Sequence, residues 1–124
     1  MSSISDTAVV DTLRRQMAIA VAKQVASSGN LANVDTPGYK TKDVNFAETL
    51  KNKLGPGNST FPNAPNGGIV LQDAEDLPVR RDGNNVQIDR ELMSMSRAAG
   101  DFSAAQTALA AKFRLVRYAI NEGR

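Results

Sequence analysis

The side chains that could carry chemistry in this sequence are almost all carboxylates. The chain has no His and no Cys, so the commonest general base, the thiol nucleophile and the usual transition-metal ligands are absent. Its one acidic cluster, Asp73, Glu75 and Asp76, could form a weak cation site or a carboxylate pair. A solvated loop is the interpretation we favour. The sequence therefore predicts no enzyme, no cofactor and no metal.

The net charge of the chain and its distribution along the sequence indicate no particular ligand. The 15 basic and 13 acidic residues sum to +2 and are interspersed, which does not favour nucleic-acid binding. Lys112, Arg114 and Arg117 fit a solvated helix face. We expect neither a nucleic-acid partner nor a small-molecule substrate.

Membrane and export signals are also weak. No run approaches the roughly 20 apolar residues that span a bilayer. The first basic residue is Arg14, and residues 1–7 are mostly small and polar, unlike a cleavable secretory signal. We therefore expect a soluble chain without a cleaved signal peptide.

The elements that position these residues are mainly helical. All five prolines lie between residues 37 and 78, which predicts a helix at each end of the chain. We divide the chain into an N-terminal helix (1–36), a middle segment (37–88) and a C-terminal helix (89–124). The predicted fold is a mainly α, antiparallel coiled-coil-like hairpin of the two long helices.

Each end carries an apolar stripe with alternating spacings of three and four residues, which is typical of a helix seam. The seam of the C-terminal helix contains one polar gap, Gln106, and Asp89 can cap the start of that helix. The large apolar members of both seams are Val10, Leu13, Met17, Leu31, Leu92, Met95, Phe102, Leu109, Phe113, Val116 and Ile120. Smaller or polar residues at the intervening seam positions are Ala20, Gln24, Ser27 and Ala99.

The middle segment contains several short predicted elements. A capping-box pattern predicts a short helix over residues 45–54, and a stretch rich in Gly, Pro, Asn and Ser predicts a flexible loop over 55–68. Apolar runs predict a strand at 69–71 and a β-hairpin that pairs 77–81 with 86–88.

A sharp turn follows the first helix. Thr36-Pro37-Gly38-Tyr39 fits a type II turn, because Pro fixes the first central residue and Gly allows positive φ at the second. Asn30 and Asn33 can donate to carbonyls that lack a helical partner. The residues of this motif are Asn30, Leu31, Asn33, Thr36, Pro37, Gly38 and Tyr39.

The run from Ser28 to Lys40 closely resembles the signature near the N-terminus of the flagellar rod, hook and hook-associated axial proteins. Segments 43–46 and 82–91 most resemble the short proximal rod members of that family. The resemblance is strong over about residues 25–50 and looser over 82–120.

The resemblance implies a structural subunit of the flagellar basal body. Family members are exported unfolded through the flagellar type III apparatus and stack helically into the hollow rod that crosses the periplasm. The implied partners are other copies of the chain, other rod proteins, the membrane-ring adaptor protein FliE and the export apparatus.

The seams suggest how such a subunit would assemble. A two-helix hairpin leaves one flank of each apolar stripe exposed to water, and neighbouring copies could cover it. Our hypothesis is that Phe113, Val116 and Ile120, or the opposite end of the same seam, contact other subunits. Two alternatives stay open: the second proximal rod protein of the family, and a helical adaptor or export chaperone.

Overall fold

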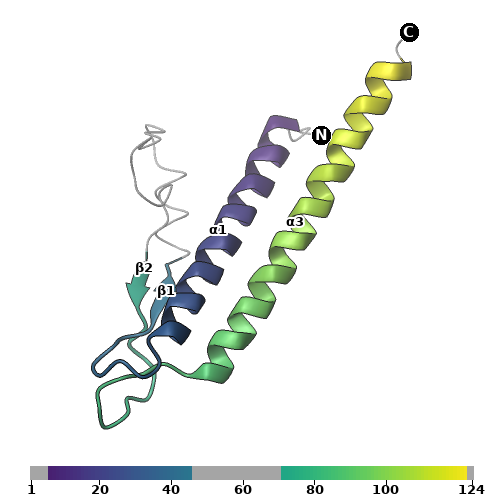
Figure 1. Ribbon diagram of the computed structural model, residues 1–124. Helices are drawn as coiled ribbons and strands as arrows, with labels where there is room; N and C mark the ends of the chain where they lie inside the picture. The colour runs from purple at the N-terminus through teal and green to yellow at the C-terminus, as the bar shows by residue number, and fades with distance from the viewer. Residues whose placement is uncertain (1–5, 46–70, 123–124) are drawn as a thin grey trace, which may run out of the picture.

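The computed structural model describes residues 6–45 and 71–122. Its elements, in chain order, are α1 (Asp6–Ala32), β1 (Lys42–Val44), β2 (Leu71–Asp73) and α3 (Ile88–Glu122). Helices α1 and α3 pack side by side and run in opposite directions, so that the start of α1 and the end of α3 lie at one end of the hairpin (Figure 1). The small sheet lies at the other, closed end. This arrangement confirms the mainly helical hairpin.

Local signals set the ends of both helices. Acidic side chains occupy the first turn of each, Asp6 in α1 and Asp89 with Glu91 in α3, where they favour the positive end of the helix dipole. Helix α1 ends at Ala32, well before Pro37, and α3 begins one residue earlier than expected, at Ile88. Neither helix of the described part combines the length and apolar content needed to cross a membrane.

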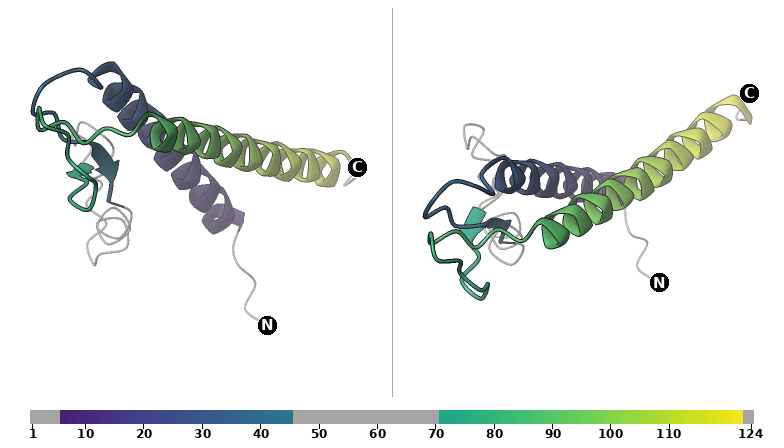
Figure 2. Two further views of the ribbon diagram at one scale, coloured as in Figure 1. Left: turned by 90° about the horizontal axis from the view of Figure 1, so that it is seen from below. Right: turned by 60° about the horizontal axis from the view of Figure 1, so that its bottom comes forward.

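Apart from Asn30 and Glu91 at the closed end, the fully buried positions between the helices are small. They are Ala20 and Ser27 on α1 and Ala98 and Ala105 on α3, and each pair is separated by seven residues, or about two turns. Small side chains let two helix backbones approach closely. The helices cross at an angle, as Figure 2 shows, so close packing is confined to the middle and closed end of the hairpin.

The face of α3 that packs against α1 differs from the predicted seam. At three positions the buried residue precedes the predicted seam residue by one. Glu91, Ala98 and Ala105 are buried, whereas their neighbours Leu92, Ala99 and Gln106 are exposed. Four residues after each buried position lies a large side chain that is half-buried, namely Met95, Phe102 and Leu109. The inner stripe thus shares only its half-buried positions with the predicted seam, and α3 turns several of its largest side chains outward.

The predicted β-hairpin between residues 77–81 and 86–88 is wrong. The sheet instead pairs β1 with β2 in antiparallel register, with Lys42 opposite Asp73 and Val44 opposite Leu71. Residues 77–87 form turns and irregular chain, because the two asparagines between the expected strands turn inward and bond to other loops. The predicted helix at 45–54, the loop at 55–68 and most of the strand at 69–71 lie outside the described residues.

Gly100 lies in α3 with open space around it. A Cβ built there would meet nothing within 4 Å, so no close backbone approach within the described chain requires this glycine.

The position of the seam gives a direct test. Ala98→Leu should lower the free energy of unfolding by about 1–3 kcal/mol, because the added side chain must enter a closely packed helix contact. Ala99→Leu makes the same change at the exposed neighbouring position and should stay within about 0.5 kcal/mol of wild type. Urea titration followed by circular dichroism measures both. Equal effects would place the seam elsewhere.

Candidate assembly surface

A buried asparagine joins the helical hairpin to its closed end. Asn30 is 0% exposed, and its Nδ2 donates to the Lys42 carbonyl at 2.8 Å and to Glu91 Oε2 at 3.0 Å. Its Oδ1 accepts from the Lys42 N–H at 2.9 Å and from the Tyr39 hydroxyl at 3.1 Å. All four hydrogen-bonding positions of this amide are used, so one side chain ties together α1, β1 and α3.

Glu91 links this contact to two further charged side chains, Arg90 and Asp43. The residue is 1% exposed, and its Oε1 accepts from Arg90 at 3.0 Å. Arg90 also donates to Asp43 Oδ2 at 3.0 Å. A buried carboxylate is tolerated where it is paired and hydrogen-bonded, and here Arg90 and Asn30 satisfy it from two sides.

The turn after α1 packs against the loop before α3. Tyr39 N–H donates to the Thr36 carbonyl at 3.2 Å and Gly38 has φ of 75°, the features of the type II turn that the sequence predicts. Gly38 N–H donates to the Asp82 carbonyl at 2.7 Å. A second glycine with positive φ, Gly83 at 85°, lies so close that a Cβ on it would be 3.2 Å from Gly38 Cα.

Two adjacent asparagines complete the junction. Asn84 Nδ2 donates to the Asn33 and Thr36 carbonyls at 2.8 and 2.9 Å. Asn85 accepts from the Thr41 N–H at 2.6 Å and donates to the Ala74 carbonyl at 3.0 Å. Both side chains are buried. They satisfy backbone groups that no strand ladder reaches, which explains why this region forms no hairpin.

The two asparagines of the motif have different roles. Asn33 donates to the Gly29 carbonyl at 2.8 Å, as expected for a side chain at a helix end. Asn30 instead bonds to a strand and to the other helix. The motif residues therefore form one structural junction, although Thr36, Pro37 and Gly38 themselves are exposed.

The seam residues divide into an inner and an outer group. Those of α1 are half-buried against the rest of the chain, namely Val10, Leu13, Met17 and Leu31. On α3 the outer group consists of Leu92, Phe113, Val116 and Ile120, which are 52%, 57%, 42% and 67% exposed. Their role in assembly stays a prediction. Among the large apolar residues of the predicted seams, only this outer group is exposed on the surface of the single chain.

The C-terminal end of α3 carries a dense apolar surface, which we call the distal apolar end. Lys112 forms an ion pair with Asp6 in the first turn of α1, so α3 residues beyond it have no described part of α1 beside them (Figure 1). The exposed large apolar side chains of this end are Phe113, Leu115, Val116, Tyr118 and Ile120. Exposed apolar clusters of this kind are typical of interaction sites.

Sequence reasoning missed the residues that matter most inside the chain. Glu91, Ala98 and Ala105 lie outside the predicted seam, although the structure buries all three. The signal was present, because Glu91, Ala98, Ala105 and Lys112 recur at a spacing of seven and alternate with large apolar residues. Asn84 and Asn85 gave no comparable signal, since Asn is common in exposed turns.

The acidic cluster shows no metal-ligand geometry. Asp73 pairs with Lys42 across the sheet, and no group of three or more carboxylates in the described part of the chain is placed to hold a metal ion. Glu75 and Asp76 are exposed.

Together, the hairpin, its polar junction and its exposed distal apolar end describe a mainly helical protein. Three relatives share the name flagellar basal body rod protein FlgB. The protein of Bacillus subtilis is 25% identical over 132 aligned residues, covering the whole of both chains. Those of Buchnera aphidicola and Salmonella typhimurium are 36% and 33% identical over 56% of this chain and 61% of their own lengths.

These comparisons confirm the resemblance noted from the motif: the chain is similar to FlgB rod proteins of the bacterial flagellum. No family model matches the chain.

The junction predicts a large effect of a small substitution. Asn30→Asp removes two N–H donors and places a carboxylate beside Glu91, so the free energy of unfolding should fall by about 3 kcal/mol or more. Adding Glu91→Gln should recover part of the loss, because the Gln amide can donate to the new carboxylate. Chemical unfolding of the single and double variants measures this coupling. Additive effects would show that the two side chains do not interact.

The two glycines of the junction should differ in their response to alanine. Both have positive φ, which costs a non-glycine residue about 1–2 kcal/mol. Only Gly83→Ala also forces a Cβ against another backbone, so it should destabilise by about 1 kcal/mol more than Gly38→Ala. Thermal unfolding of the two variants compares them. A larger loss for Gly38→Ala would contradict the described contact.

Proposed function

We propose that the chain is a structural subunit of the proximal rod of the flagellar basal body, which assembles with copies of itself and with other rod proteins through the distal apolar end of α3. The observation that carries this proposal is the exposure of five large apolar side chains within eight residues, Phe113 to Ile120. The relatives named FlgB support the same role.

The distribution of these side chains indicates more than one neighbour. With about 100° per residue, Phe113, Val116 and Ile120 fall on one face of α3, whereas Leu115 and Tyr118 fall on nearly the opposite face. A helix that is apolar on opposite faces is normally buried from several sides. One neighbouring helix could cover only one of these faces, so the distal end suits a packed, multi-subunit array.

The two helix lengths support the same arrangement. The 27 residues of α1 span about 40 Å and the 35 residues of α3 about 52 Å. The difference leaves the last turns of α3 without a partner from α1, and a sister molecule is the simplest source of a covering surface.

The wider setting follows from the rod relationship. The subunit would be exported through the flagellar type III apparatus without signal cleavage, and would join the rod that crosses the periplasm. Its partners would be other rod proteins and the membrane-ring adaptor FliE. This role requires no catalysis, cofactor, small-molecule substrate or nucleic acid.

Two other functions would also suit a helical hairpin. The second proximal rod protein, FlgC, is disfavoured because all three reported relatives bear the name FlgB. A helical adaptor or export chaperone would also present amphipathic helices. Fractionation separates these roles: a rod subunit co-purifies with basal bodies, whereas a chaperone stays in the cytosol.

The distal end offers a specific test. Phe113→Asp should reduce incorporation into basal bodies at least about tenfold, because it buries an unpaired charge between subunits. Since Phe113 is 57% exposed in the single chain, the monomer should fold normally and export should continue. Immunoblots of purified basal bodies and of secreted fractions measure the two steps.

The matched control is Asn121→Asp, which adds the same charge to an exposed polar position near the same end. It should leave incorporation and motility near wild type. Normal motility of the Phe113→Asp strain would contradict the proposal, as would an equal loss in the control.

A further inference from the structure

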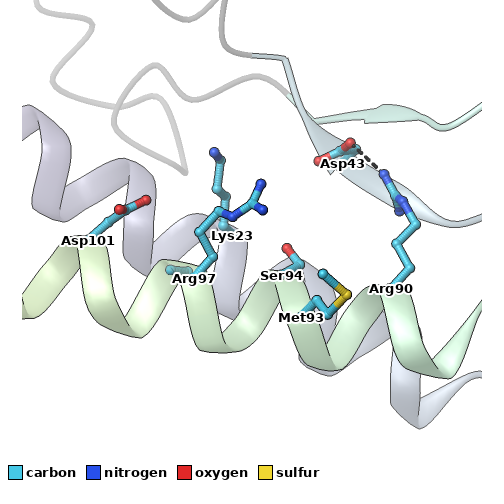
Figure 3. A pocket seen from close by; sticks show the side chains of 8 residues that line it. Lys23, Asp43, Arg90, Met93, Ser94, Arg97 and Asp101 are labelled. Carbon is cyan, nitrogen blue, oxygen red and sulfur yellow. Dashed lines mark hydrogen bonds and ion pairs between the residues drawn. The ribbon is translucent and has the colours of Figure 1, made fainter.

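A polar groove lies between α1 and α3, close to the sheet. It has a volume of about 450 Å³, and its charged lining residues are Lys23, Asp43, Arg90, Arg97 and Asp101. Figure 3 shows these side chains along one side of the helix pair, with the Asp43 to Arg90 ion pair at the end of the groove nearest the strands.

The groove has an excess of positive charge. Arg90 is already paired, with Asp43 and with Glu91. Within the described residues, Lys23, Arg97 and Asp101 form no ion pair. Two cations therefore share the groove with a single unpaired carboxylate, and an additional anionic group would reduce their repulsion.

A second hollow of about 460 Å³ adjoins the first and has the opposite charge. It is lined by the acidic segment Asp73-Ala74-Glu75-Asp76, and it shares Asp43 and Arg90 with the groove. Asp73 is paired with Lys42, whereas Glu75 and Asp76 are exposed and form no ion pair with the rest of the described chain. The Asp43 to Arg90 pair thus separates a basic hollow from an acidic one on the same chain.

We propose that this face binds a second copy of the chain, with Glu75 and Asp76 of one copy entering the groove formed by Lys23 and Arg97 of the next. The inference rests on the proposed rod function and names one of its subunit contacts. Charge complementarity supports it, because the groove has one more unpaired cation than unpaired carboxylates, and the second hollow has two unpaired carboxylates.

The positions of the two hollows determine the kind of assembly. Arg90 borders both hollows, and Arg97 lies about two turns, or roughly 10 Å, further along α3. The acidic segment therefore meets a neighbour's groove when that neighbour is shifted along the hairpin. Two different patches in contact form a heterologous interface, which continues as an open helical array when the rotation does not close.

The ion pairs supply register more than affinity. Exposed ion pairs contribute only about 0–1 kcal/mol each, but a wrong pairing of like charges is disfavoured and the attraction steers the approach. The distal apolar end would hold the subunits together, and the charged hollows would select the shift between them.

The absence of Cys from the chain allows a clean cross-linking test. A chain carrying both Glu75→Cys and Arg97→Cys, expressed in the flagellated host and oxidised in purified basal bodies, should form disulfide-linked dimers and a ladder of longer multimers. Glu75→Cys with Gln106→Cys is the matched control, because position 106 lies about 180° around α3 from position 97. The control should form cross-linked species at least about tenfold less.

Each alternative outcome is visible in the same experiment. Dimers without a ladder would indicate a closed, isologous contact and overturn the proposed shift. Cross-links to a different protein, or equal yields in the control, would overturn the choice of partner. If the wild-type chain does not enter basal bodies at all, the rod function itself fails, and that result is seen before oxidation.

A charge exchange tests the same contact without cysteines. Lys23→Glu with Arg97→Glu should reduce incorporation into basal bodies, as should Glu75→Lys with Asp76→Lys, whereas the chain carrying all four changes should recover. Circular dichroism of the purified variants confirms that each folds. A four-fold variant that assembles no better than either pair would overturn the pairing.

Discussion

The hydrogen-bonded amide of Asn30 is the contact on which the rest of the structure depends. It lies where the last turn of α1, the strand β1 and the first turn of α3 meet, and it has one bonding arrangement that satisfies all its donors and acceptors. Because Glu91 is buried in the same place, any sliding of α3 along α1 would separate one oxygen of its carboxylate from the Asn30 amide and leave that oxygen without a donor in the interior. The junction therefore fixes the register of the two helices, whose small contact residues alone would tolerate other registers.

That register explains why large apolar side chains face outward. With Glu91 held against Asn30, the seven-residue spacing brings Ala98 and then Ala105 to the contact with α1. Close contact through alanine leaves no room for bulky residues at these levels. Leu92, one residue away, then faces solvent, and Phe113 lies beyond the first turn of α1. The single chain thus satisfies the Asn30 amide and the Glu91 carboxylate internally and leaves large apolar side chains exposed.

Sequence reasoning recovered the elements better than their contacts. Proline placement and three-four spacing were enough to predict two long helices, and the Pro37-Gly38 pair predicted the turn, because both depend on local backbone preferences. The face of α3 that contacts α1 depends on the burial of Glu91. A glutamate in the first turn of a helix is normally expected to be exposed to solvent, so its burial is not predicted from the sequence. The β-hairpin was predicted wrongly for a similar reason. Asp82-Gly83-Asn84-Asn85 has the composition of a hairpin turn, but its asparagine side chains bond to the loop at 33–41, about 50 residues earlier. No local sequence pattern reveals such a contact.

The closed and open ends of the hairpin differ in chemistry, as suits the assembling subunit that we propose. Polar contacts are directional and costly to leave unmade, so they specify geometry, and the chain completes them within itself around Asn30 and Asn84. Apolar contacts are non-directional and scale with area, so they suit association, and the chain leaves them incomplete from Phe113 to Ile120. If the two chemistries were exchanged, with unpaired buried polar groups at the open end, the free subunit would be strongly destabilised before meeting a neighbour. The observed order lets the hairpin take a defined shape alone and still gain free energy when it is covered.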